Sequence, residues 1–175
     1  MTILYIITRF LTFPGSLIRT FIEHIICRIH KTVVEDNRSL RNDELCSHIE
    51  HELLETAGGA FAICFAPMLV QLILAFFVSM PAVLNLLYLG AFSFPLSLID
   101  VACLYIGFSL LVNCFPSIED SINMIEKLYK GKANIFQKII FAPGAVICYA
   151  GAYLERYCVT FVTSVALIVF MALKV

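Results

Sequence analysis

Residues 57–80, AGGAFAICFAPMLVQLILAFFVSM, decide the fold class of this chain. A transmembrane helix needs about 20 mostly apolar residues, and this stretch is longer than that and carries no charge. Pro67 lies inside it, which predicts a kink, and Pro81 directly after it predicts its end. The stretch therefore predicts a helix that crosses a membrane.

The composition of the whole chain agrees with a lipid environment. Its 175 residues are 61% hydrophobic and only 14% charged, and its mean hydropathy is +0.92. Soluble domains carry about a quarter charged residues, and a domain of this size has too little core to bury the excess apolar surface. We expect an integral membrane protein, in the cell membrane, whose main partner is the lipid bilayer. A net charge of -1 gives no electrostatic reason to expect nucleic acid binding.

Other apolar stretches predict further membrane segments. We expect two clear spans at residues 96–116 and 157–173, a stretch at 135–154 that is split at Pro143-Gly144, and a short piece at 82–92 that is re-entrant or a tight connection. Near the start, a break at Pro14-Gly15 precedes a helix that runs from Ser16, a possible cap, to about residue 29. The fold class predicted is all-α, a polytopic transmembrane helical bundle of about four to six membrane segments with a small polar membrane-edge loop.

A single integral membrane domain, 1–175, accounts for this order of elements. Two polar connections divide it, and basic residues occur in both, so that loop charge does not fix the orientation. The expected parts are an initial segment and polar helix (1–30), a polar loop of extended or hairpin-like form (31–56), central spans (57–116), an amphipathic helix (117–134) and a C-terminal helical pair (135–175).

Ionisable side chains within apolar helices normally pair with one another, because isolated charges are costly in lipid. In FPGSLIRTFIEHIIC, residues 13–27, Arg19 and Glu23 are four apart and can form an ion pair on one helix face. His24 is rotated about 100 degrees from Glu23 and is either a core histidine or part of the same cluster.

Two further motifs carry residues that can bind metals. CSHIEHELLE, residues 46–55, holds His48 and His51 among carboxylates, which suits a metal site or a solvated polar edge. NCFPSIED, residues 113–120, brings Asp120 near the end of a span. Helix capping explains this second motif as well, with Ser117 as N-cap and Asp120 at the third helical position.

Taken together, FPG, HIEHE and FPSIEDSINM give the chain a resemblance to the site-2-protease-like integral membrane zinc metalloproteases over roughly residues 13–129. The resemblance implies a membrane helix with HExxH, which supplies two zinc ligands and a general base, and an aspartate ligand from a later helix. Asp120 matches that aspartate. Zinc with an open coordination position would activate water.

This chain departs from the pattern at the ligands themselves. Counted from Pro14-Gly15, Arg19 stands in place of the first histidine, Thr20 in place of the base and Glu23 in place of the second histidine. The inverted order HxxEH fits Glu23 and His24, but Thr20 again replaces a histidine. Arginine cannot ligate zinc, because its guanidinium stays protonated.

Three functional hypotheses remain open at this point. The first is a non-catalytic membrane protein, a pseudoprotease or scaffold that binds a membrane peptide or partner helix, with Arg19, Glu23, His24 and Asp120 as a polar intramembrane cluster. The second is a zinc metalloprotease with an altered ligand set, with Glu23 as candidate catalytic residue and His24, His48, His51 and Asp120 as candidate ligands. The third is an unrelated small polytopic transporter or assembly subunit, in which these side chains do not converge.

Overall fold

The structure is a computed structural model that describes residues 2–40, 46–89, 98–131, 133–155 and 157–174. Within these ranges the chain is all-α, as predicted, apart from one pair of short strands. The elements are α1 (Thr2–Leu11), α2 (Phe13–His30), β1 (Val34–Asp36), β2 (Glu50–His51), α3 (Ala57–Leu89), α4 (Leu98–Val112), α5 (Ile118–Ile125), the π-helix η1 (Glu126–Lys130), α6 (Ile135–Glu155) and α7 (Val159–Lys174).

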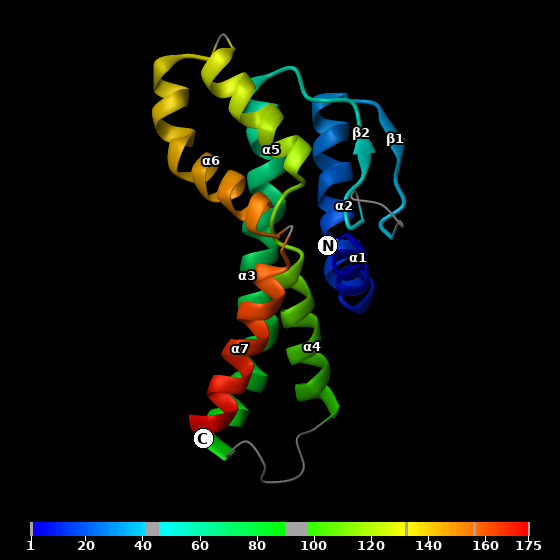
Figure 1. Cartoon of the computed structure of the whole chain (residues 1–175), viewed down its shortest axis with the longest axis vertical. Helices are drawn as coiled ribbons and strands as arrows, with labels where there is room; N and C mark the ends of the chain where they lie inside the picture. The colour runs from blue at the N-terminus through cyan, green and yellow to red at the C-terminus, as the bar shows by residue number, and fades with distance from the viewer. Residues whose placement is uncertain (1, 41–45, 90–97, 132, 156, 175) are drawn as a thin grey trace.

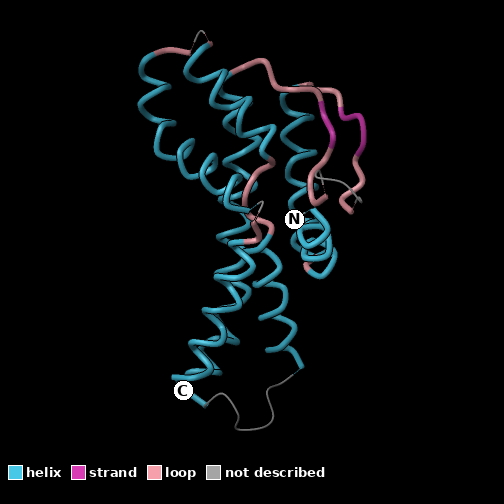
Figure 2. The backbone as a smooth tube through the Cα atoms, viewed as in Figure 1, coloured by secondary structure: helices cyan, strands magenta, loops and turns pink. Residues whose placement is uncertain are grey.

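Helix α3 is the central element and runs along most of the molecule (Figure 1). α2, α5 and α6 pack around the half that contains its N-terminus, and α4 lies beside its other half with α7 against α4. The two polar connections, which hold the β strands and α5, lie at the same end of the molecule (Figure 2). They share that end because α3 leads away from it and α4 returns toward it.

Two helices are long and apolar enough to cross a membrane, by length and composition: residues Ala57–Asn85 of α3 and Ile135–Glu155 of α6. α4 is apolar but shorter than a membrane span. Among the described residues, no other helix combines the length and the apolar composition that a span requires. α3 and α6 are thus two candidate spans, and the predicted polytopic bundle of four to six membrane segments stays a prediction. About 33% and 28% of the apolar windows of these helices are buried, so most of their apolar surface lies outside the core.

The prolines interrupt the helices less than predicted. α2 begins at Phe13 and passes through Pro14-Gly15, and the chain breaks at Thr12 instead. This is permitted because proline in the first helical turn removes only an N–H that has no helical partner. α3 also continues through Pro81 to Leu89, and α6 continues through Pro143. A helix can continue through a proline, because unfolding a further turn would leave more backbone groups without hydrogen bonds than the proline does.

The polar connections have the predicted forms. β1 and β2 pair as an antiparallel, hairpin-like element in the first connection. Ser117 caps α5 by accepting a hydrogen bond from the Asp120 backbone N–H at 3.1 Å, and the helical run ends before Gly131. Helix capping therefore accounts for this motif as predicted. The possible cap at Ser16 is not used, since this residue lies inside α2.

Close approach of α2 to α4 positions the polar site. A Cβ on Gly15 would lie 2.1 Å from the Ser109 carbonyl oxygen, so only glycine fits there. The Gly15 N–H donates to Ser109 Oγ at 2.7 Å, and Gln71 Nε2 of α3 donates to the Gly15 carbonyl at 2.8 Å. These contacts hold the first turn of α2 against the C-terminal half of α4.

Candidate functional site

The first three turns of α2 bury polar residues and expose large apolar ones. Arg19 and Glu23 are 0% and 1% exposed, whereas Phe21 on the opposite face is 65% exposed. Arg19 Nε lies 2.8 Å from Glu23 Oε1, which confirms the predicted ion pair. A helix with this inverted pattern suits an apolar solvent, because the charged pair is shielded by its neighbours.

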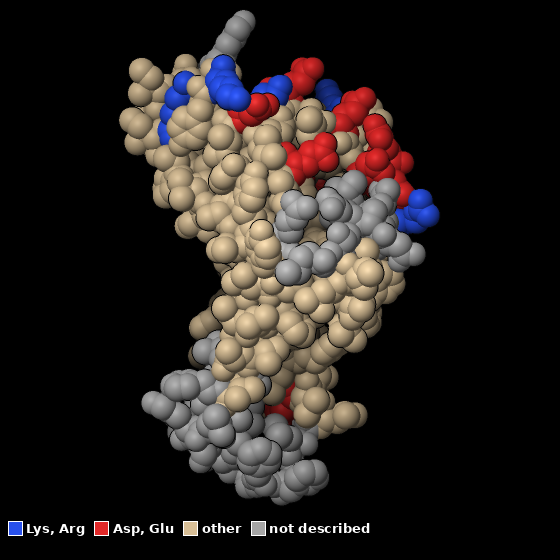
Figure 3. All heavy atoms as spheres, in the orientation of Figure 1, with Lys and Arg blue, Asp and Glu red and all other residues tan. Residues whose placement is uncertain are grey.

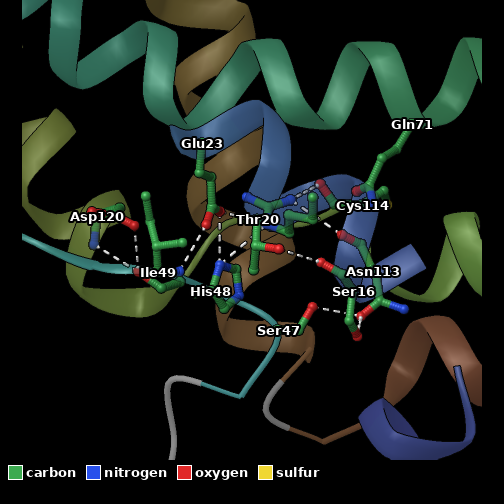
Figure 4. A network of polar contacts seen from close by, with 12 residues as sticks. Ser16, Thr20, Glu23, Ser47, His48, Ile49, Gln71, Asn113, Cys114 and Asp120 are labelled. Carbon is green, nitrogen blue, oxygen red and sulfur yellow. Dashed lines mark hydrogen bonds and ion pairs between the residues drawn. The ribbon is translucent and has the colours of Figure 1, made fainter. Parts of the chain in front are cut away.

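A third group, His48 from the connection between β1 and β2, contacts this pair (Figure 4). His48 Nδ1 lies 2.9 Å from Glu23 Oε1 and 3.1 Å from Arg19 Nε. A protonated Nδ1 cannot also accept a hydrogen bond, so we assign its proton to the bond with the carboxylate. The Ile49 backbone N–H donates to Glu23 Oε2 at 3.1 Å. Both carboxylate oxygens of Glu23 are therefore satisfied.

Burial keeps His48 uncharged. It lowers the pKa of His48 below the ordinary value of 6.5, and the positive charge of Arg19 lowers it further, against the opposing effect of Glu23. A neutral imidazole beside one cation and one anion leaves the Arg19–Glu23–His48 cluster without net charge. This is the least costly charge state for a site without contact with water.

The guanidinium of Arg19 also caps the end of α4. Its Nη1 donates to the carbonyls of Asn113 and Cys114 at 3.2 and 2.6 Å. These two carbonyls directly follow the last residue of α4, Val112, so the cation lies at the negative end of the helix dipole, where it is stabilising. Of the described donors of Arg19, Nη2 alone has no hydrogen-bond partner in the described part of the chain.

A second buried arginine, which sequence reasoning missed, serves the same helix end. Arg9 of α1 is 1% exposed and donates through Nη1 to the Val112 carbonyl at 2.5 Å and to Asn113 Oδ1 at 2.9 Å. Its Nη2 lies 3.3 Å from Glu155 Oε1. Two arginines thus cap three successive carbonyls, 112 to 114. The available signal was an arginine within an apolar segment, which requires a buried partner.

Asn113 connects these groups through its side chain. Its Oδ1 accepts hydrogen bonds from Arg9, Ser16 Oγ at 2.9 Å and Ser47 Oγ at 2.6 Å. Its Nδ2 donates to Thr12 and to the Ser109 carbonyl at 2.8 Å. One amide therefore joins α1, α2, α4 and the polar loop.

Asp120 does not join this cluster, which corrects the expectation that its carboxylate turns toward Arg19. Its Oδ1 lies 3.4 Å from His51 Nε2, and Ser117 Oγ donates to its Oδ2 at 2.7 Å. The N-cap interaction with Ser117 holds the carboxylate at the start of α5. His51 Nδ1 in turn lies 2.8 Å from the Glu52 carbonyl oxygen.

His24 is likewise separate from the cluster. It is half-buried, and its Nδ1 has no hydrogen-bond partner within the ranges described above. One position along a helix rotates a side chain by about 100 degrees, which takes His24 off the face that Glu23 shares with Arg19. The predicted set of Arg19, Glu23, His24 and Asp120 is thus replaced by Arg19, Glu23 and His48. The separation of Asp120 from Arg19 is the arrangement expected for an unrelated polytopic protein, whereas the pairing of Arg19 with Glu23 is the one expected for the polar cluster.

The donor set does not fit a zinc ion. No group of three His, Cys, Asp or Glu side chains that could hold a metal occurs among the described residues. Arg19, at the position of the first expected ligand, cannot ligate a cation, and Glu23, at the position of the second, is already bonded to Arg19 and to the Ile49 backbone N–H. Thr20, in place of the catalytic base, donates its hydroxyl back to α2 carbonyls at 3.0 and 3.1 Å and has no basic group to offer.

Comparison with known proteins adds no relative: no family model, curated protein or solved structure matches this chain. The candidate site is therefore defined by its geometry alone.

Proposed function

We propose that this chain is a non-catalytic integral membrane protein on a site-2-protease-like scaffold, a pseudoprotease that works by binding a membrane peptide or partner helix. The supporting observation is the Arg19–Glu23–His48 cluster, in which a guanidinium stands at the position of the first expected zinc ligand and bonds a carboxylate and two carbonyls. A site filled by its own cation has no group left to activate water.

The membrane part of the proposal is supported by α3 and α6 and by their outward apolar side chains. Phe76 and Phe77 of α3 are 59% and 66% exposed, and Phe136 of α6 is 73% exposed. Surfaces of this kind are normal toward lipid or another apolar helix and unfavourable toward water.

Zinc content tests the non-catalytic part. The protein would be purified in detergent without chelators, exposed to zinc, passed through a desalting column and analysed for bound metal. We expect far less than one zinc per chain. Zinc near one per chain, lost on His48→Ala or His51→Ala, would overturn the proposal and favour a metalloprotease with an altered ligand set.

A restored variant tests the scaffold part separately. Arg19→His, Thr20→Glu and Glu23→His together recreate HExxH on α2. If the scaffold resembles the zinc proteases, this variant should gain about one zinc per chain, with Asp120→Ala in the same background as the matched control that loses it. A folded restored variant that binds no zinc would contradict the resemblance and favour an unrelated polytopic protein.

A further inference from the structure

Charged side chains gather at one end of the molecule, where the two polar connections lie (Figure 3). Apart from the buried Arg9 and Arg19, the cations whose side chains are described belong to these connections or to the helix turns that adjoin them: Arg28, Lys31, Arg38, Lys127, Lys130 and Lys138. Acidic residues accompany them, so the end as a whole is not basic. The positively and negatively charged side chains are, however, unevenly distributed over this end.

Three lysines form what we call the basic corner: Lys127 and Lys130 of η1 and Lys138 of α6. The Lys138 ammonium donates to the Tyr129 carbonyl at 3.4 Å, which ties the start of α6 to η1. Glu126 lies 2.9 Å from the Lys130 ammonium, and this lysine side chain remains 78% exposed. With Glu126 counted, two positive charges remain at the corner.

The opposite side of the same end is acidic. Glu35 and Asp36 lie on or next to β1, and Glu50 and Glu52 lie on or next to β2. In Figure 3 acidic atoms are concentrated over the β strands, and basic atoms over α5 and α6. The basic corner is thus a local feature.

Apolar side chains adjoin the basic corner directly. Ile135, Phe136 and Ile139, in the first turns of α6, are 77%, 73% and 68% exposed. The apolar surface continues down the helix through Val146 and Ile147. An acidic soluble partner would match the lysines and leave this apolar surface in water. A bilayer accounts for both, since acyl chains cover the helix while lysine ammonium groups extend to the headgroups.

We propose that the basic corner binds the headgroups of anionic phospholipids in the leaflet that this end of the molecule faces. Phosphates of acidic lipids attract basic groups next to a membrane helix, and the effect is local because salt screens it within about 10 Å. The proposal requires residence in a membrane and is independent of the likeness to zinc proteases.

Lipid discs with defined mixtures of phosphatidylglycerol and phosphatidylcholine test it. The quantity measured is the enrichment of phosphatidylglycerol among lipids that remain bound after transfer to detergent. Neutralising Lys127, Lys130 and Lys138 to glutamine should lower this enrichment on the order of a hundredfold, since each lysine contributes about fivefold. Raising the salt from 0.05 to about 0.5 M should reduce the enrichment of the unmodified protein in the same direction.

The matched control neutralises three cations away from the corner: Arg28, Lys31 and Arg38 to glutamine. This variant should keep its phosphatidylglycerol enrichment. Equal enrichment in the corner variant and the unmodified protein would overturn the proposal, and so would an equal loss in both triple variants, which would indicate a general charge effect. If the corner variant does not fold in phosphatidylcholine discs, Lys130→Gln alone decides, with a loss of about fivefold expected.

Discussion

Replacing Arg19 by methionine should destabilise this protein more than any exposed substitution. Methionine keeps the length of the side chain and removes its charge and its donors. Glu23 is then a buried carboxylate without its cation, and the carbonyls of Asn113 and Cys114 lose their donor. Breaking a buried ion pair from one side costs about 3–5 kcal/mol, and an unsatisfied buried carbonyl about 1–3 kcal/mol.

Protonation of Glu23 limits the charge contribution. Protonating a carboxylate of ordinary pKa near 4.3 at pH 7 costs about 3.7 kcal/mol. Loss of the positive charge therefore cannot lower the free energy of unfolding by more than this, because Glu23 would become protonated instead. We therefore expect a total loss of at least about 5 kcal/mol at pH 7. At pH 5 the cost of protonation falls by about 2.7 kcal/mol, so the gap between variant and unmodified protein should narrow.

The assay is the free energy of unfolding in detergent micelles, measured by titration with a denaturing detergent at both pH values. Arg38→Met is the matched control: its guanidinium pairs with Asp36 at 2.7 Å but is 76% exposed, so we expect a loss under about 0.5 kcal/mol. The double variant Arg19→Met, Glu23→Met should recover at least about 2 kcal/mol, because no unpaired charge remains. A loss within about 1 kcal/mol for Arg19→Met would refute the reasoning.

Three further predictions follow from individual contacts. Because burial lowers the pKa of His48, the unfolded state binds more protons than the folded state below pH 6.5, and the free energy of unfolding should fall there by up to about 1.4 kcal/mol per pH unit. In unfolding measured as a function of pH, His48→Gln should reduce this slope. The control His30→Gln, at an exposed position, should leave the slope unchanged. Gly15→Ala should cost at least about 2 kcal/mol, because its Cβ would meet an α4 carbonyl, whereas Gly58→Ala, with open space around it, should be neutral or stabilising by up to about 1 kcal/mol in thermal unfolding. Asn113→Leu should lower the unfolding temperature strongly and abolish its recovery on refolding, since several buried partners lose their bonds together.

Local patterns in the sequence predicted those parts of the site that depend on local geometry. The pairing of Arg19 with Glu23 follows from a spacing of four within one helix, and the cap at Ser117 follows from the residue types at the start of α5. Both are set by a single turn of backbone. They did not require knowledge of which helices are neighbours.

The parts that failed depend on contacts between distant segments. His48 reaches Glu23 across 25 residues, and Arg9 reaches Asn113 across 104. No spacing rule links such positions, so Asp120 and His48 could not be ranked as partners of α2. The proline breaks were wrong for another reason: rules drawn from water-exposed helices overestimate the effect of proline where the alternative is an unsatisfied backbone in apolar surroundings.

Arg19 has two structural roles, because it pairs with Glu23 and also donates hydrogen bonds to carbonyls at the end of α4. A zinc ion in its place would bind carboxylates and imidazoles, but it would not donate hydrogen bonds to the carbonyls of Asn113 and Cys114. Arg9 alone would then cap the end of α4. A chain with histidine at position 19 would therefore lose these hydrogen bonds, and its folded state would depend on a bound metal to offset the loss. On this reasoning, the guanidinium stabilises the junction of α1, α2 and α4 as well as its own charge pair, and the site is part of the structural core.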